Sequence, residues 1–281
     1  MIVKQTAYCL FLLLLILCSC KEHKQKEKEV EVIKCRELET SMLSSLLTEN
    51  KLDGVVLIYD EQKKVYHSNN FEESKVKLLP ASTFKIPNSI IGLESGILKD
   101  AKSVFKWDGK SRSFPMWEKD LTLQEAFQVS CVPCYQELAI KIGVDTMTSY
   151  LARLQYPGMI VNQESLDMFW LKGNSKISPQ EQIEFLKRLH KSDLDVSQHA
   201  TKTMIDIMVI DKNADYSLSG KTGWGIIDDK NIGWFVGYLE VDGKPYFFAT
   251  AITPHSDFDM KKFVTMRKEI TLKAFGALGI I

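Results

Sequence analysis

The sequence carries no net charge, and this absence limits the partners that it can have. Lysine plus arginine and aspartate plus glutamate number 36 each in 281 residues, so the formal charge is zero. A domain that binds nucleic acid usually carries a surplus of basic residues that attracts phosphates, and no such surplus is present here. We therefore expect neither a nucleic-acid partner nor any other strongly charged partner.

Long hydrophobic runs are also missing. The apolar stretch from Ala7 to Leu17 follows Lys4 and is too short to span a bilayer, but it suits the core of a signal peptide. It ends in Leu17-Cys18-Ser19-Cys20, which resembles a bacterial lipobox with Cys20 as the lipidated residue; a plain secretory signal is the alternative. The pattern predicts export across the inner membrane and an anchor on a membrane surface in the periplasm.

The two segments that follow from this reading have different compositions. Residues 1–20 are predicted to be a signal peptide of the lipoprotein type. Residues 21–36 carry mixed charges and few apolar side chains, which is typical of a polar tether that cannot pack.

Cysteine is scarce, and the six cysteines form no metal-binding pattern. Beyond the predicted signal peptide, only Cys131 and Cys134 lie close together, as C-x-x-C, and no second C-x-x-C or H-x₃-H pattern accompanies them. We therefore expect no metal site. In an oxidising compartment the two residues could form a redox pair, although no thioredoxin-like βαβ pattern surrounds them, and the sequence does not decide whether they are bonded.

Internal repeats and low-complexity segments are absent beyond the tether, so residues 37–281 are predicted to form one large domain. An opening helix and a hairpin are followed by a mostly helical lobe over about residues 78–195, then by three strands and a closing helix. Because the strands lie at both ends of the chain, we expect an α/β fold of the α+β type: an antiparallel sheet with flanking N- and C-terminal helices and a helical second lobe. The expected elements are helices Glu37–Asn50, Thr83–Leu98, Thr122–Cys131, Cys134–Ile142, Val144–Leu154, Pro179–His190 and Phe258–Ile281, and strands Gly54–Tyr59, Val65–His67, Ser219–Trp224, Ile232–Glu240 and Tyr246–Ile252.

The motif that organises the chemistry is Ser82-Thr83-Phe84-Lys85, which reads S-x-x-K. Positions three apart share a helix face, so Ser82 and Lys85 are expected to lie side by side. A serine hydroxyl needs a neighbouring base to act as a nucleophile, and a lysine can be that base only when it is uncharged. The apolar neighbours Phe84, Ile86 and Pro87 favour the uncharged form. By itself this short motif could equally mark an ordinary helix start with an exposed lysine.

Two later motifs make the pattern specific. Ser130-Cys131-Val132 and Lys221-Thr222-Gly223-Trp224 follow in the order and rough spacing of the serine penicillin-recognising enzymes. Valine at the third place of the second motif is the class D form, whereas class A enzymes and many penicillin-binding proteins have asparagine there. From about Gly54 to the C-terminus the chain resembles the class D (oxacillin-hydrolysing) serine β-lactamases. Further stretches that fit this family are Phe105–Gly109, Phe127–Pro133, Phe169–Gly173 and Lys176–Pro179.

The resemblance implies a reaction and assigns roles to matching residues. The protein would hydrolyse the β-lactam ring of penicillin-type antibiotics through an acyl-enzyme on Ser82, with Ser130 relaying a proton to the lactam nitrogen. Lys85 would take up CO₂ from bicarbonate and act as a carbamate base, and no other cofactor is implied. The backbone N–H groups of Ser82 and Trp224 would form the oxyanion hole. The residues expected to bind substrate or to shape the pocket are Val132, Trp170, Lys221, Thr222, Gly223, Trp224 and Arg267.

Simpler roles compete with some of these assignments. Val132 and Trp170 could be ordinary core, and Arg267 could lie on a solvated helix face. One stretch also departs from the family: Tyr156-Pro157-Gly158 stands where class D enzymes usually carry Y-G-N, which leaves the substrate range open.

Three other functions share some of these features. A β-lactam-sensing receptor domain is acylated without fast turnover, but normally follows several membrane spans that this sequence does not show. A peptidoglycan D,D-peptidase uses the same nucleophile, usually with asparagine in the second motif. A thiol–disulfide protein would use Cys131 and Cys134. The sequence gives no indication of the oligomeric state.

Overall fold

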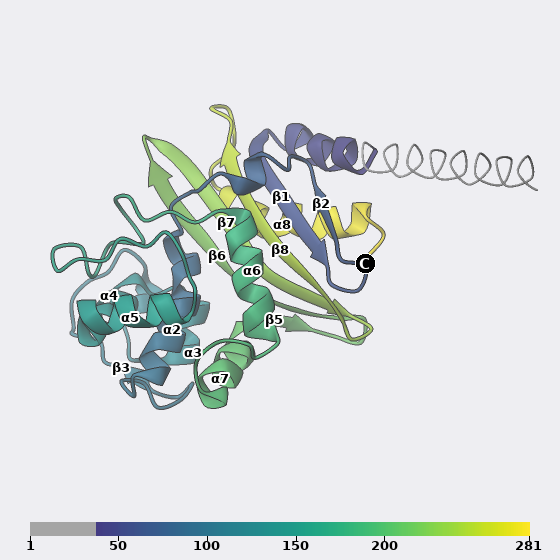
Figure 1. The fold of residues 1–281 in the computed structure, drawn as a ribbon. Coiled ribbons are helices and arrows are strands. Elements are labelled where there is room, and N and C mark those ends of the chain that lie inside the picture. Colours follow the sequence, from purple (N-terminus) through teal and green to yellow (C-terminus); the bar gives the residue numbers. More distant parts are fainter. Residues whose placement is uncertain (1–37) are drawn as a thin grey trace, which may run out of the picture.

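The computed structural model describes residues 38–281. The predicted signal peptide, the lipidation site Cys20 and the tether lie outside the described residues. The described chain consists of a sheet with a helical lobe at one side (Figure 1). The strands that build the sheet come from both ends of this region, as expected from the sequence.

The main sheet has six strands in the order β2-β1-β8-β7-β6-β5, and all neighbours pair antiparallel. The N-terminal hairpin therefore joins the C-terminal meander through the pair β1–β8, in which Val56 lies opposite Thr250. A separate two-stranded sheet in the helical lobe consists of β3 and β4. The strands are β1 Leu52–Asp60, β2 Val65–Ser68, β3 Val104–Phe105, β4 Leu121–Thr122, β5 Val209–Lys212, β6 Tyr216–Ile227, β7 Lys230–Val241 and β8 Lys244–Pro254.

The helices follow the predicted order, with one addition and several shifted ends. Residues 38–49 form the opening helix. Helix α7, which the sequence analysis did not predict, leads directly into β5. The α-helices are α2 Lys85–Glu94, α3 Leu123–Gln128, α4 Val132–Ile142, α5 Val144–Arg153, α6 Pro179–His190, α7 Gln198–Met208 and α8 Phe263–Ala277, and the 3₁₀ helices are η1 Glu73–Lys75, η2 Ala81–Phe84 and η3 Pro115–Trp117.

Helix starts in the lobe are fixed by capping residues that the sequence makes recognisable. Ser178 accepts a hydrogen bond from the Glu181 N–H while the Glu181 carboxylate accepts one from the Ser178 N–H. Thr122 and Glu125 form the same reciprocal capping box at the start of α3. Each box satisfies two backbone donors that a helix start leaves free, which explains why α6 begins where predicted.

The sheet separates two hydrophobic cores, because successive side chains of a strand point to opposite faces. On β8, Phe248 and Ile252 pack with α8, while Phe247, Ala249 and Ala251 belong to the core shared with the helical lobe. Figure 1 shows α8 on one face of the sheet and α6 on the other. The functional motifs lie in and around the second of these cores.

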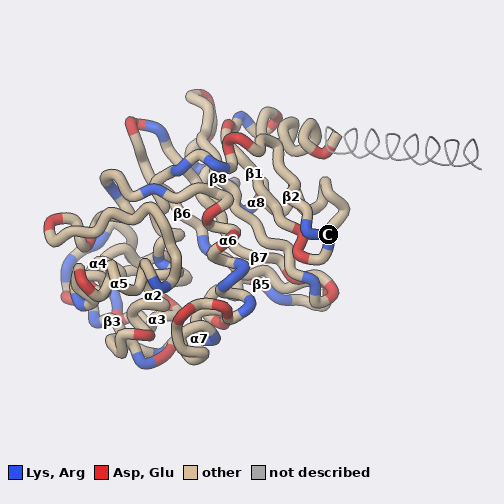
Figure 2. Tube along the Cα trace, in the orientation of Figure 1, with Lys and Arg blue, Asp and Glu red and all other residues tan. Residues whose placement is uncertain are grey.

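Basic and acidic residues are interspersed along the described chain, as the tube in Figure 2 shows. Between residues 38 and 281, no helix combines the length and apolar character needed to cross a bilayer. In the same range no three His, Cys, Asp or Glu side chains gather closely enough to hold a metal ion.

Candidate active site

Ser82 lies in the 3₁₀ helix η2, immediately before α2, and its side chain is almost fully buried. In a 3₁₀ helix residues three apart are eclipsed, so the fourth residue, Lys85, comes directly beside the hydroxyl. The preceding residue Ala81 has a φ of 49°, in the left-handed region that non-glycine residues rarely adopt. Its N–H donates to the Trp170 carbonyl at 2.9 Å, which holds the segment in this conformation.

Lys85 is fully buried, and its Nζ donates to Ser82 Oγ at 3.1 Å. Burial lowers the pKa of this amine well below its ordinary value, and the positive charge of Lys221 lowers it further. No carboxylate of the described chain contributes to this shift. The predicted pairing of the two residues is confirmed, and the amine has the environment of an uncharged base.

An aromatic ring lies beside the Lys85 amine, and two more pack on each other next to it in the chain and in the core. The Tyr135 ring on α4 lies with its centroid 4.9 Å from Lys85 Nζ, and its hydroxyl is hydrogen-bonded to Ser89 Oγ at 2.7 Å. Trp170 is completely buried and stacks on Phe84 with centroids 5.5 Å apart. Tyr135 was not among the predicted site residues, although its position three residues beyond Val132 places it on the same face of α4.

The Trp170 indole N–H is a buried donor without a hydrogen-bond partner among the residues that the structure describes. Such groups are rare in folded proteins, because an unpaired buried donor costs about 1–3 kcal/mol. Trp170 therefore differs from an ordinary core residue in having a donor that is still free to bind an acceptor.

Val132, the third residue of the second motif, is half-buried at the start of α4.

A second hydroxyl–amine pair faces the first. Lys221 on β6 donates to Ser130 Oγ at 3.0 Å, and also to the Thr222 carbonyl at 3.0 Å. Burial and the positive charge of Arg267 lower the pKa of Lys221 to about 7. Ser130 has a φ of 55°, so a sharp left-handed turn between α3 and α4 presents its side chain. The two serine motifs and the K-T-G motif thus meet at one place.

Arg267 points into the molecule, which excludes the alternative of a solvated helix face. Only 6% of its surface is exposed, and its Nη1 donates to the Gly223 carbonyl at 2.6 Å. Glycine at position 233 makes room for it, because a Cβ there would lie 2.8 Å from Arg267 Cδ. Burial lowers the pKa of Arg267 to about 10, which still leaves it charged at neutral pH.

The other residues of the K-T-G strand lie on β6 with different exposures. Gly223 is buried, and a Cβ at this position would meet Thr83 Cγ2 and Trp234 Cβ at 3.2 Å each. Thr222 is half-buried, whereas the Trp224 side chain is exposed and donates to Asn231 Oδ1 at 2.8 Å. Glycine at position 223 therefore allows β6 to approach the nucleophile segment closely.

A cavity of about 280 Å³ opens beside Lys221. It lies between the end of α3, the junction of α7 and β5, and strand β6. The unpredicted helix α7 therefore contributes one side of the cavity. Its lining residues include Phe127, Ile207, Met208, Ile210, Lys221 and Thr222.

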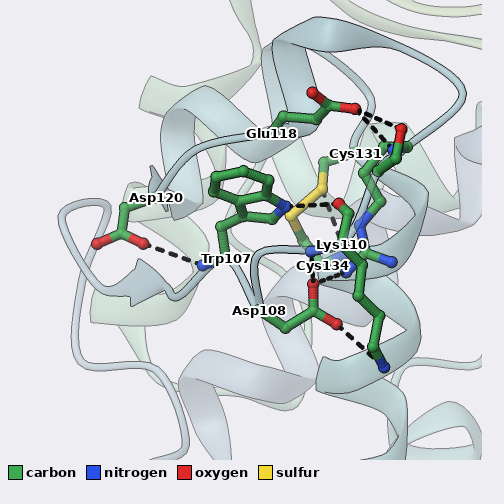
Figure 3. A network of polar contacts seen from close by, with 9 residues as sticks. Trp107, Asp108, Lys110, Glu118, Asp120, Cys131 and Cys134 are labelled. Atoms are coloured by element: carbon green, nitrogen blue, oxygen red, sulfur yellow. Dashed lines mark hydrogen bonds and ion pairs between the residues drawn. A yellow bond between two sulfur atoms is a disulfide. The ribbon is translucent and has the colours of Figure 1, made fainter.

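The loop between β3 and β4 is held in shape by its own polar groups (Figure 3). The Trp107 N–H donates to Asp120 Oδ1 at 3.0 Å, and its indole N–H donates to the Lys110 carbonyl at 2.8 Å. The Arg112 N–H donates to Glu118 Oε1 at 2.8 Å. The family-like stretch Phe105–Gly109 thus belongs to an ordered loop.

The stretch Tyr156-Pro157-Gly158, which departs from the family pattern, is anchored from both ends. The buried Tyr156 hydroxyl donates to Gln182 Oε1 at 3.4 Å, and Gln182 Nε2 in turn donates to Thr83 Oγ1 at 2.9 Å. Gly158 has a φ of 76°, and a Cβ there would lie 1.9 Å from the Lys176 carbonyl oxygen. The glycine in third place is therefore required by the backbone, and Tyr156 is connected to the nucleophile segment through Gln182.

Comparison with known proteins agrees with this geometry. Residues 47–270 match the penicillin binding protein transpeptidase domain. The chain is 39% identical over 211 residues to beta-lactamase OXA-48 of Klebsiella pneumoniae, covering 75% of this chain and 79% of that protein. It is 35% identical over 263 residues to beta-lactamase OXA-10 of Pseudomonas aeruginosa, covering 89% of this chain and 96% of that protein.

Solved structures show the same relationship in three dimensions. The class D beta-lactamase of Sebaldella termitidis superposes with a TM-score of 0.82 at 41% identity, covering 85% of this chain and 96% of that one. The class D beta-lactamase YbXI from Nostoc gives 0.81 at 39% identity, covering 85% and 99%. With Ser82, the amines of Lys85 and Lys221 and the buried Arg267 arranged as described, the chain belongs to the class D serine β-lactamases.

Proposed function

We propose that the protein hydrolyses the β-lactam ring of penicillin-type antibiotics through an acyl-enzyme on Ser82, and thereby confers antibiotic resistance. The observation that carries this proposal is the buried amine of Lys85 at 3.1 Å from Ser82 Oγ, without an acidic partner in the described chain. An uncharged amine in this position can accept the serine proton, which an ammonium ion cannot do.

We further propose that Lys85 reacts with CO₂. Two features of the pocket fit such a group: the amine is disfavoured in its charged form, and the buried Trp170 N–H has no other acceptor in the described structure. When bound, CO₂ would supply an anionic oxygen base whose strength suits proton transfer near neutral pH. Trp170 would donate to that oxygen and so hold it beside Ser82.

Acylation then uses both hydroxyl–amine pairs. Ser82 Oγ attacks the lactam carbonyl carbon while its proton passes to the Lys85 side chain, and the carbon–nitrogen bond of the ring breaks. Ser130 gives its proton to the departing nitrogen and regains one from Lys221, to which it is hydrogen-bonded. The N–H groups of Ser82 and Trp224 would donate to the carbonyl oxygen; each such donor is typically worth about 10²–10³ in rate.

Deacylation reuses the same base, which first passes the Ser82 proton through solvent to the neutral Lys221 amine and at the end returns the water proton to the serine oxygen. A water molecule attacks the acyl carbon, and its proton moves to the Lys85 side chain as the new carbon–oxygen bond forms. The bond to Ser82 Oγ breaks, and the serine oxygen regains a proton. The hydrolysed antibiotic leaves as a carboxylic acid with an opened ring.

Substrate orientation depends on the cationic end of the site. Penicillins carry a carboxylate, and Lys221, Thr222 and Arg267 are grouped through contacts with one another and with the Gly223 carbonyl. A buried arginine without an acidic partner among the described residues can donate strong hydrogen bonds to such an anion. We assign carboxylate binding to these three residues.

The test compares the protein with its Lys85→Ala and Ser82→Ala variants on benzylpenicillin and a chromogenic cephalosporin. Loss of the base should lower turnover by about 10²–10⁴. Added bicarbonate should raise the wild-type rate and move the acid limb of the pH profile to lower pH, because CO₂ binds only the uncharged amine. Full activity of Lys85→Ala would contradict the role of the amine.

Mass spectrometry of the intact protein after mixing with penicillin distinguishes the competing functions. A transient adduct on Ser82 supports the hydrolase, whereas a lasting adduct without turnover would indicate a β-lactam sensor. Cleavage of D-Ala-D-Ala peptides in place of penicillin would indicate a peptidase.

We also propose that Cys20 carries a lipid anchor on the periplasmic side of a membrane, supported by its lipobox-like sequence. Metabolic labelling with a radioactive fatty acid should mark the wild type and not Cys20→Ala. Equal labelling of both proteins would contradict the proposal.

A further inference from the structure

A disulfide bond joins Cys131 and Cys134 in the middle of the active-site region. Figure 3 shows the two sulfur atoms as a yellow bond at the start of α4. Cys131 is the middle residue of the second serine motif, so the bond begins at the residue after Ser130 and encloses Val132. The two cysteines are 1% and 8% exposed, which leaves little access for an exchanging thiol and disfavours the alternative of a thiol–disulfide protein.

Along the chain, the bond lies between two residues that each contact one of the two buried amines. Directly before it, Ser130 contacts Lys221 at 3.0 Å. Directly after it, the Tyr135 ring lies 4.9 Å from Lys85 Nζ. No role in the proposed chemistry uses the sulfur atoms themselves.

The turn that presents Ser130 needs support. Its φ of 55° lies in the left-handed region, where residues with a Cβ are disfavoured. The Ser130 N–H donates to Phe127 O at 3.2 Å and the Cys131 N–H donates to Ala126 O at 2.9 Å, so both bonds tie the turn to the end of α3. On the α4 side, the Cys134 N–H donates only to Cys131 Sγ, at 3.2 Å. Sulfur is a weak acceptor compared with the oxygen of the usual capping residues.

The disulfide provides the restraint on the start of α4 that the weak sulfur cap does not provide. A disulfide that encloses only two residues restricts the unfolded chain little, so its contribution to global stability lies at the low end for such bonds. Its main effect is local, because it restricts the backbone of residues 131–134 and thereby the direction in which the turn leaves Ser130.

We propose that the Cys131–Cys134 disulfide is a positioning element that holds the Ser130 hydroxyl against Lys221 for protonation of the lactam nitrogen. This inference rests on the proposed role of Ser130 in β-lactam hydrolysis. It predicts that losing the bond slows reactions that need a proton on the leaving group and spares those that do not.

The main variant is Cys131→Ser/Cys134→Ala. The serine oxygen at position 131 keeps a cap for α4, so the covalent link is the principal loss. Peptide mass spectrometry first verifies the bond in the exported wild-type protein. Thermal unfolding of both proteins verifies that the variant folds. Wild-type protein that is unfolded, reduced with dithiothreitol, which becomes a cyclic disulfide as the two thiols form, and then refolded provides a second comparison.

Two substrates separate positioning from general damage. Benzylpenicillin needs a proton on its nitrogen, whereas p-nitrophenyl acetate acylates a serine and releases a phenolate that needs none. We expect kcat/KM for benzylpenicillin to fall about tenfold without the bond, part of the ~10²–10⁴ that a positioned acid contributes. The acylation rate with the ester should change less than about twofold, since Ser82 and Lys85 do not depend on this proton.

A double-mutant cycle with Ser130→Ala completes the test. If the bond acts through Ser130, its removal in the Ser130→Ala background should produce no further loss with benzylpenicillin. An equal loss with both substrates, an unchanged rate with benzylpenicillin, or the same further loss in the Ser130→Ala background would each overturn the inference. Wild-type protein that is oxidised and cleaves no β-lactam would instead refute the proposed function itself.

Discussion

Trp170 combines complete burial with an indole donor that has no partner in the described structure. Trp170→Phe keeps an aromatic ring against Phe84 and removes only this donor. Because the donor is unpaired without CO₂, its removal should not lower the free energy of unfolding measured in CO₂-free buffer. With CO₂ present, we expect slower deacylation and a greater requirement for bicarbonate.

Two measurements check this expectation for Trp170→Phe. Urea unfolding gives the free energy of unfolding, and stopped-flow mixing with penicillin gives the deacylation rate. Deacylation at the wild-type rate without added bicarbonate would show that Trp170 is ordinary core.

Deprotonation of Lys221 should set the alkaline limb of the pH profile of kcat/KM. Its pKa of about 7 means that it is charged below this pH and neutral above it. Since the substrate carboxylate is anionic throughout, kcat/KM should fall about tenfold per unit as pH rises above 7. Lys221→Arg keeps the charge, so the variant should be slower but lack this limb. A limb near pH 7 in Lys221→Arg would assign it to another group.

At the scale of single elements, strand β6 depends on glycines that allow close approach to β7. A Cβ at Gly237 would lie 2.0 Å from the Ser219 carbonyl oxygen and 2.6 Å from Gly220 Cα. Gly237→Ala should therefore lower the free energy of unfolding by about 1–3 kcal/mol. It should also lower activity, because Lys221 follows Gly220 directly.

Gly276→Ala is the matched control for this strand glycine. Gly276 is exposed within α8, and the nearest heavy atom to a Cβ there is 4.0 Å away. Alanine favours a helix, so this variant should gain about 0.5–1 kcal/mol. Thermal unfolding of both variants provides the comparison, and a stable Gly237→Ala would contradict the close approach.

The sequence predicts elements best where a local signal marks them. The capping box and proline at Ser178–Glu181 gave the start of α6, and turn residues separated β6, β7 and β8. Helix α7 lacks such clear marks: Ser197 caps it without an acidic partner, and it passes into β5 without a break. The strands β3 and β4 have two residues each, and only tertiary pairing defines strands this short.

The site residues differ in the same way: some are predictable from their neighbours in the sequence, and others depend on residues far away in the chain. The pair Ser82–Lys85 follows from their separation by three residues, and the two other motifs are recognisable as sequence patterns. The burial of Arg267 was not predictable from its helix alone, because it depends on the missing side chain of Gly233 on another element. Bonding between Cys131 and Cys134 also depends on how α4 begins in the fold.

For the whole molecule, the pairing of N-terminal with C-terminal strands in one sheet predicts cooperative unfolding. The N-terminal strands pair with the C-terminal β8, and the helical lobe is inserted between them. Phe275 on α8 is completely buried against Phe248, with ring centroids 5.7 Å apart. Phe275→Ala should lower the free energy of unfolding by about 3–5 kcal/mol. The lobe should unfold together with the sheet in this variant.

Urea unfolding followed by circular dichroism and by tryptophan fluorescence tests this coupling. Trp107, Trp117 and Trp170 report on the lobe, and Trp224 and Trp234 report on the sheet. The fluorescence and circular dichroism signals should therefore change with the same midpoint. A fluorescence transition at lower urea than the change in circular dichroism would show a lobe that unfolds by itself.

The strand order has a further consequence for biosynthesis. Strand β1 must wait for β8, and the pair Ser82–Lys85 must wait for Lys221, which arrives on β6. A polypeptide that is still growing on the ribosome thus carries Ser82 without the second amine, and with only part of the sheet. Ser82 and Lys85 should therefore stay unreactive toward β-lactams until nearly the full chain has been synthesised.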